Sequence, residues 1–180
     1  MGNSNISNIN NCSKPVDKNN RIGIIGFGNI MMGDDGIGVR VIDEIKKQGI
    51  FNNYKNIELI DGGTSGVDLI FILQNVDKAI IIDAVNAGQE IGKIAVFKTD
   101  EIKKMFKKNG AFRSFSFHDI ELTEIFELLK TLNINTEIKI IGINPENVGY
   151  SNKLSSRIES KIPEMISEVE KEVAGFNQDI

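Results

Sequence analysis

Short apolar runs rich in isoleucine and valine alternate along this chain with longer segments in which apolar residues recur every three to four positions. The short runs are typical of strands, and the three-to-four spacing is typical of amphipathic helices. Their alternation favours parallel βαβ units over an all-β meander. Residues 79–83, with the sequence AIIID, are almost continuously apolar, which suits a central strand covered on both faces. The sequence therefore predicts an α/β fold built on a mostly parallel sheet.

The boundaries of these elements follow from turn and cap signals. One helix should start at Asp34 or Asp35, another should follow a cap at Thr64, and a short charged helix is expected near residues 100–108. A further helix uses Ile120 and Ile125 in its apolar stripe, and a last one starts near Ser155. Pro163 should kink that last helix or split it in two. The five predicted strands are residues 22–26, 57–60, 79–83, 93–97 and 137–142.

Bulk composition limits the class of protein. A chain of 180 residues that is 41% hydrophobic fits one ordinary domain, predicted as residues 21–180 after a disordered, Asn- and Ser-rich tail at 1–20. The net charge of -4 and the lack of a basic stripe argue against a nucleic-acid partner. Without a secretory apolar segment or an apolar run of membrane length, we expect no membrane association and a cytoplasmic location. Cys12 is the single cysteine, which excludes an internal disulfide framework.

Three polar features are predicted at one edge of the sheet, because loops and helix starts converge beyond the carboxyl ends of parallel strands. The first is the glycine-rich turn GFGN and the Asp34-Asp35 pair after it, the second is Asp83, and the third is His118. Asp34 and Asp35 project about 100° apart on a helix, so both can hardly address one ligand. We interpret Asp34 as the helix cap and dipole partner, which leaves Asp35 for the cleft.

Each of the other two residues also has a purely structural interpretation. Asp83 could end a buried strand and hold loop amides, and His118, with Phe112, Phe115 and Phe117 nearby, could be packed in the core. The set of two carboxylates and one imidazole at the same edge favours the functional interpretation. Oxygen and nitrogen donors of this kind suit a divalent transition metal with open positions for water or substrate.

The glycines could alternatively bind a nucleotide. GFG after a strand is half of a dinucleotide fingerprint, but Met31 occupies the third glycine position, and no acid follows at the expected distance after a second strand. No GK[ST] follows, so a phosphate-binding P-loop is absent. The DGGT sequence at residues 61–64 predicts a tight turn and a helix cap, and its glycines would also let a peptide backbone approach closely.

The motifs together are more specific than any one of them. GNxxxxDDGxG, then DGGT, a strand-ending Asp in AIIIDAV, SFHDIEL and IIGINPENVGYS follow one another in this chain. In this order they resemble the hydrogenase maturation protease family, over nearly everything after Arg21. The resemblance implies a three-layer αβα sandwich with a twisted, mostly parallel five-stranded sheet. It also implies that Asp35, Asp83 and His118 are both the metal-binding and the catalytic residues.

The resemblance further implies a substrate and a metal. Members of this family remove the C-terminal extension of a nickel-iron hydrogenase large-subunit precursor after its centre has been loaded. The implied cofactor is therefore nickel carried by the precursor, which the three residues would recognise and orient. Whether an Asp also acts as general base is left open by the sequence. The alternatives are a non-catalytic nickel-binding chaperone of hydrogenase assembly and a nucleotide-binding α/β protein.

Overall fold

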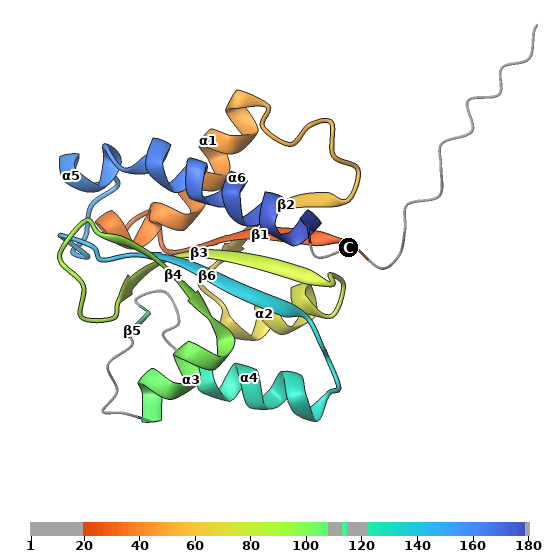
Figure 1. Cartoon of the computed structure of the whole chain (residues 1–180). Coiled ribbons are helices and arrows are strands. Elements are labelled where there is room, and N and C mark those ends of the chain that lie inside the picture. The colour runs from red at the N-terminus through yellow and green to blue at the C-terminus, as the bar shows by residue number, and fades with distance from the viewer. Residues whose placement is uncertain (1–19, 108–112, 115–121, 179–180) are drawn as a thin grey trace, which may run out of the picture.

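The computed structural model describes residues 20–107, 113–114 and 122–178 (Figure 1). Nearly all of the predicted N-terminal tail therefore lies outside the described residues. Within them, no helix is long and apolar enough to cross a membrane. In chain order the elements are β1 (Ile22–Phe27), the 3-10 helix η1 (Gly33–Gly36), α1 (Ile37–Gln48), β2 (Ile57–Gly63), α2 (Gly66–Leu73), β3 (Lys78–Asn86), β4 (Ile94–Lys98), α3 (Thr99–Lys107), β5 (Arg113–Ser114), α4 (Leu122–Thr131), β6 (Glu137–Ile143), α5 (Ser156–Glu159) and α6 (Ile162–Gln178).

The sheet has the strand order β2-β1-β3-β6-β4. Its first four strands are parallel, and β4 pairs antiparallel with β6 at the edge. The predicted fold of a mostly parallel five-stranded sheet is thereby confirmed. The two-residue strand β5 was not predicted. It pairs antiparallel with Val85 and Asn86 of β3 and lies in none of the five strands expected from the sequence.

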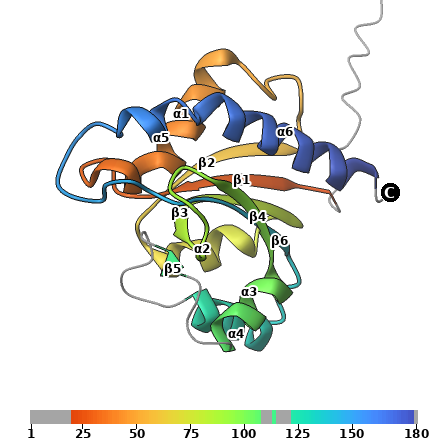
Figure 2. The same cartoon turned by 60° about the vertical axis from the view of Figure 1, so that its left-hand side comes forward.

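Helices cover both faces of the sheet, which gives three layers (Figures 1 and 2). The chain passes from β1 to β2 on one side of β1 and then from β2 to β3 on its other side. Connections of the same hand that run in opposite directions place their helices on opposite faces, and α1 and α2 belong to different cores. The core on one face is built with α1, α5 and α6, and the core on the other with α2, α3 and α4. The central strand β3 is buried from Ala79 to Val85, as its apolar sequence predicted.

Two strands extend beyond their predicted ends. β2 continues through Gly63 because its last residues still pair with the end of β1, where Gly63 lies opposite Phe27. β3 continues past Asp83 to Asn86, since β6 pairs with it up to Ala84 and β5 pairs with its last two residues. Asp83 is therefore inside a strand and does not end one.

The helix starts differ from the predictions in two places. Residues 33–36 form a 3-10 turn, and the α-helix begins only at Ile37. The predicted cap at Thr64 is wrong, since α2 begins at Gly66 after Ser65, whose side chain makes no cap hydrogen bond. The predicted division at the C-terminal end is confirmed: α5 and α6 are separate helices, and Pro163 lies in the first turn of α6, where a missing N–H costs nothing.

Candidate functional site at the β1–β3 crossover

The strand order reverses between β1 and β3, and open α/β sheets bind ligands beyond the carboxyl ends of strands at such a point. β1 and β3 pair from Ile22 and Lys78 up to Gly26 and Ile82. Beyond this pair Phe27 of β1 still pairs with Gly63 of β2, while β3 stays paired with β6. The two strands thus separate directly before Asp83. We call this point of separation, beyond Gly26 and Ile82, the β1–β3 crossover.

Glycines bring the start of α1 into this gap. A Cβ atom on Gly38 would lie 2.2 Å from the carbonyl oxygen of Ile82 and 2.3 Å from that of Phe27. A Cβ on Gly28, whose φ is +137°, would lie 1.9 Å from the backbone oxygen of Asp35. Only glycine allows backbones to approach so closely. The glycine spacing of GFGN and DDGIG therefore serves the packing of η1 and α1 against the ends of β1 and β3.

Asp35 belongs to η1, which contacts β3, and only 2% of its surface is exposed. Its Oδ2 accepts a hydrogen bond of 2.9 Å from the backbone N–H of Asn29. Other amides of the same turn are also used internally: Gly28 donates to the carbonyl of Gly63, and Met31 donates to the side chain of Asn29. Because these N–H groups point to protein acceptors, the turn does not present them to a phosphate, which argues against the nucleotide alternative.

Asp83 is fully buried in β3, where it pairs with Gly142 of β6. Side chains along a strand alternate between the two faces of the sheet, so Asp83 is on the same face as Ile81 and Val85. Those two residues belong to the core that packs against α2, α3 and α4. Val85, two residues further on, pairs with Ser114 of β5. The crossover therefore holds two carboxylates shielded from water, a situation that normally requires hydrogen bonds, a cation or a metal ion.

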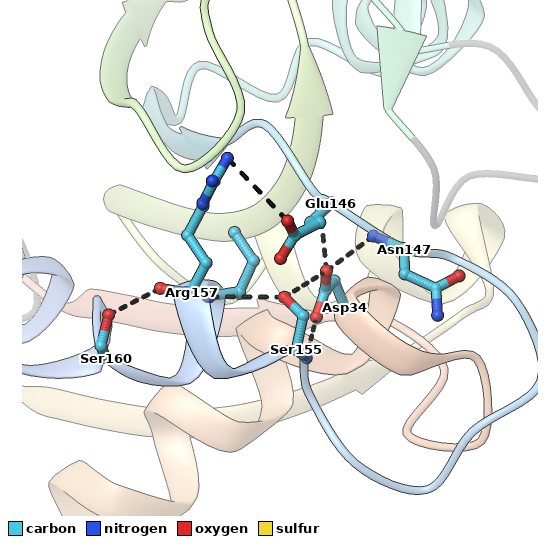
Figure 3. Close-up of polar contacts among 7 residues, drawn as sticks. Asp34, Glu146, Asn147, Ser155, Arg157 and Ser160 are labelled. Atoms are coloured by element: carbon cyan, nitrogen blue, oxygen red, sulfur yellow. Dashed lines mark hydrogen bonds and ion pairs between the residues drawn. The ribbon is translucent and has the colours of Figure 1, made fainter.

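Asp34 does not cap a helix, contrary to the prediction, because neither η1 nor α1 has a side-chain cap. Its buried carboxylate instead binds the loop before α5 (Figure 3). Oδ2 accepts from the N–H groups of Glu146 and Asn147 at 2.9 and 2.8 Å, and from the Ser155 hydroxyl at 2.9 Å. Oδ1 accepts from the Ser155 N–H at 2.6 Å. The predicted cap role of Asp34 is therefore wrong, and the predicted role of Asp35 in a ligand site stays a prediction.

No pattern in the sequence indicated that Asp34 binds this loop. Ser155 was expected only near the start of a helix, and its hydroxyl indeed accepts from the Ile158 N–H at 3.4 Å while donating to Asp34. Asp34 and Ser155 are 121 residues apart, and no local pattern pairs such positions. Two acids in succession before a helix indicate that one has a non-capping role, but they do not indicate its partner.

The structure places Asp35 and Asp83 at the same crossover, as predicted. His118, the third predicted residue, lies outside the described residues. Among the residues that are described, no three His, Cys, Asp or Glu side chains are grouped as a metal site. The predicted set of three includes His118, so it stays a prediction.

Fold and site together define a doubly wound α/β protein with buried carboxylates at the β1–β3 crossover. Residues 39–172 match the sequence model described as hydrogenase maturation protease. Because this match covers well over half of the 180 residues, the chain belongs to the hydrogenase maturation protease family. The protein is therefore a peptidase of hydrogenase maturation, which does not favour the chaperone alternative.

Individual relatives agree with this assignment. The chain is 27% identical to the hydrogenase 2 maturation protease of Escherichia coli over 151 residues, which are 83% of this chain and 88% of the relative. It is 31% identical to a putative hydrogenase maturation protease of Methanocaldococcus jannaschii, covering 81% of this chain and 80% of the relative. The structure of the Escherichia coli endopeptidase HybD aligns with a TM-score of 0.69 at 25% identity, over 83% of this chain and 89% of that one.

Proposed function

We propose that this peptidase removes the C-terminal extension of a nickel-iron hydrogenase large-subunit precursor after nickel insertion. In this proposal Asp35, Asp83 and His118 bind the nickel that the precursor carries. The observation that supports it most strongly is the burial of Asp35 and Asp83, at 2% and 0% exposure, at the crossover where ligands of such sheets bind.

The position of His118 in the sequence is compatible with this set. β5 pairs with β3 two residues beyond Asp83, and Ser114, its last residue, precedes His118 by four positions. Two carboxylate oxygens and one imidazole nitrogen suit a borderline divalent metal such as nickel. Three donors from this chain leave the other coordination positions of the nickel ion to groups of the precursor. Binding of the precursor would then depend on its being loaded with nickel.

The mechanism assigns these residues a role in recognition and orientation. The carboxylates of Asp35 and Asp83 would bind the precursor's nickel and hold the scissile peptide beside it, which converts a loose encounter into an oriented reaction. A nickel ion in that position supplies Lewis-acid polarisation or activation of water. The glycines of the crossover support this role by fixing the backbone of η1 against β1.

The test is the nickel dependence of cleavage. Precursor prepared with nickel and precursor prepared without it are each incubated with the protein, and mass spectrometry of the precursor's C-terminus follows the reaction. We expect the extension to be lost only from the nickel-loaded precursor, since the ion supplies the ligand that the carboxylates recognise. A His118→Ala variant should leave the loaded precursor untrimmed.

Two outcomes contradict the proposal. Equal trimming of the nickel-free precursor would show that the ion is not the recognition signal. Normal trimming by His118→Ala would remove the imidazole from the ligand set. A His118→Ala variant that shows the wild-type thermal transition provides the control for folding.

A further inference from the structure

Next to Asp35, two loops join to form an exposed apolar surface. Met32 and Ser151 form a parallel β-bridge, in which the Ser151 N–H donates to the carbonyl of Met31 at 2.9 Å and the Gly33 N–H donates to that of Ser151 at 2.8 Å. Tyr150 and Met31 directly precede the two bridge partners. Their exposures are 82% and 41%, and that of the adjacent Ile30 is 42%. We call Ile30, Met31 and Tyr150 the Tyr150 rim.

The rim is held at fixed points on both sides. We call the loop between β6 and α5, which carries Tyr150, the second loop. Asp34 binds it at Glu146 and Asn147, which precede the tyrosine, and at Ser155, which follows it (Figure 3). The first loop, between β1 and η1, is held by Asn29. The backbone N–H of Asn29 donates to Asp35, and its side-chain oxygen accepts from the N–H of Met31. The tyrosine thus projects from a loop with both ends fastened beside the site, so a partner would bind it without having to order the loop first.

The two segments that carry the rim contain no charged residue of their own, although Arg40 of α1 donates to the carbonyl of Asn152 at 3.0 Å. Residues 26–33 (GFGNIMMG) and 147–152 (NVGYSN) hold none, although charged residues make up 26% of the chain. The cores of protein–protein interfaces are depleted of charged residues and enriched in tyrosine and methionine. Exposed apolar side chains gathered on joined loops beside a catalytic site are typical of such an interface.

We propose that the Tyr150 rim is the surface on which the polypeptide of the precursor docks, with Tyr150 as its main contact. This inference rests on the proposed function and names the residues that bind the protein part of that substrate, apart from its metal. The rim adjoins Asp35 through the Asn29 amide, so an apolar segment seated on it lies beside the site where the peptide is cut. Asp34 is a positioning residue that keeps the rim and Asp35 in one rigid arrangement.

The experiment measures the cleavage rate against the concentration of nickel-loaded precursor. For Tyr150→Ala we expect KM to rise about tenfold with kcat within a factor of two, because truncation of an interface tyrosine removes binding and leaves the metal site intact. Tyr150→Phe should restore the wild-type KM, since the ring keeps its contact area. In an Asp35→Asn background, which is expected not to cleave, direct binding of the precursor can be compared with and without Tyr150→Ala.

The matched control is the other tyrosine of the chain. Tyr54 is 51% exposed and precedes β2, at the amino edge of the sheet away from the site. Tyr54→Ala should leave KM and kcat at their wild-type values. An equal rise in KM for Tyr54→Ala would overturn the proposal, because it would indicate a general loss of structure.

Three further outcomes would contradict the proposal or assign the Tyr150 rim another partner. An unchanged KM for Tyr150→Ala, or a loss confined to kcat, would show that the tyrosine does not contact the precursor. If wild-type protein sediments as a dimer and Tyr150→Ala as a monomer, the rim binds a second copy of this chain instead. Failure of the wild-type protein to trim loaded precursor would count against the proposed function itself, so the two failures are distinguishable.

Discussion

An Asp35→Asn variant is expected to leave the C-terminal extension attached to nickel-loaded precursor, with a cleavage rate lowered by about 100-fold or more. Loss of residues that merely support metal ligands already costs about 10- to 100-fold, and loss of a ligand should cost at least as much. Asparagine keeps an oxygen that can accept from the Asn29 N–H, so the turn is preserved. Mass spectrometry of the precursor's C-terminus over time measures the rate.

Asp83→Asn should have the same effect, since both carboxylates lie at the crossover. The control is Asp43→Asn, which makes the identical change at an exposed position of α1. This control should trim precursor at the wild-type rate. Rapid trimming by Asp35→Asn would show that its negative charge is not needed, and the residue would then be a structural acceptor for the Asn29 amide.

A Gly38→Ala variant is expected to lower the free energy of unfolding by about 3 kcal/mol, the upper part of the usual range for an overpacked core. The new methyl group would lie 2.2 Å and 2.3 Å from the carbonyl oxygens of Ile82 and Phe27. Those oxygens belong to two strands at the centre of the sheet, so neither can move without disturbing the strand pairing. Denaturant unfolding followed by circular dichroism measures the change.

The matched control for this second prediction is Gly175→Ala in α6. A Cβ at Gly175 meets only the Lys139 amino group, at 3.9 Å, which is an ordinary contact. Alanine inside a helix is more favourable than glycine by about 0.5–1 kcal/mol, so this variant should be as stable as the wild type or slightly more so. A Gly38→Ala protein with wild-type stability would mean that α1 does not begin against the gap between β1 and β3.

The sequence predicted most of the sheet because the buried strands carry their own signal. The continuous apolar run around Ile80 has few alternatives to a central strand, and the helix stripes are long enough to be recognised. β5 could not be found in this way, since two residues carry no periodicity and their pairing with β3 depends on a distant segment. The ends of β2 and β3 were missed for the same reason, because a partner strand decides where pairing stops.

The site was predicted only in part. Asp35 and Asp83 were expected at one edge of the sheet because each was placed there by its own strand, and the structure agrees. Asp34 was misinterpreted because a cap is the commonest role of an acid before a helix, whereas its actual partners are supplied by a loop more than a hundred residues away. Hydrogen bonds between distant segments follow from the completed fold, and sequence spacing alone does not reveal them.

The hydrogen bonds of Asp34 to the loop that carries Tyr150 also affect which sequence changes related proteins can tolerate there. This one carboxylate secures the chain at Asn147 and again at Ser155, so both ends of the segment that carries Tyr150 are held by a residue outside it. Insertions or exchanges around Tyr150 can then accumulate while the neighbouring carboxylates keep their geometry. If the Tyr150 rim binds the precursor as proposed, changes in this one short stretch would alter which precursor is accepted, and the same stretch would be the place to introduce a different specificity.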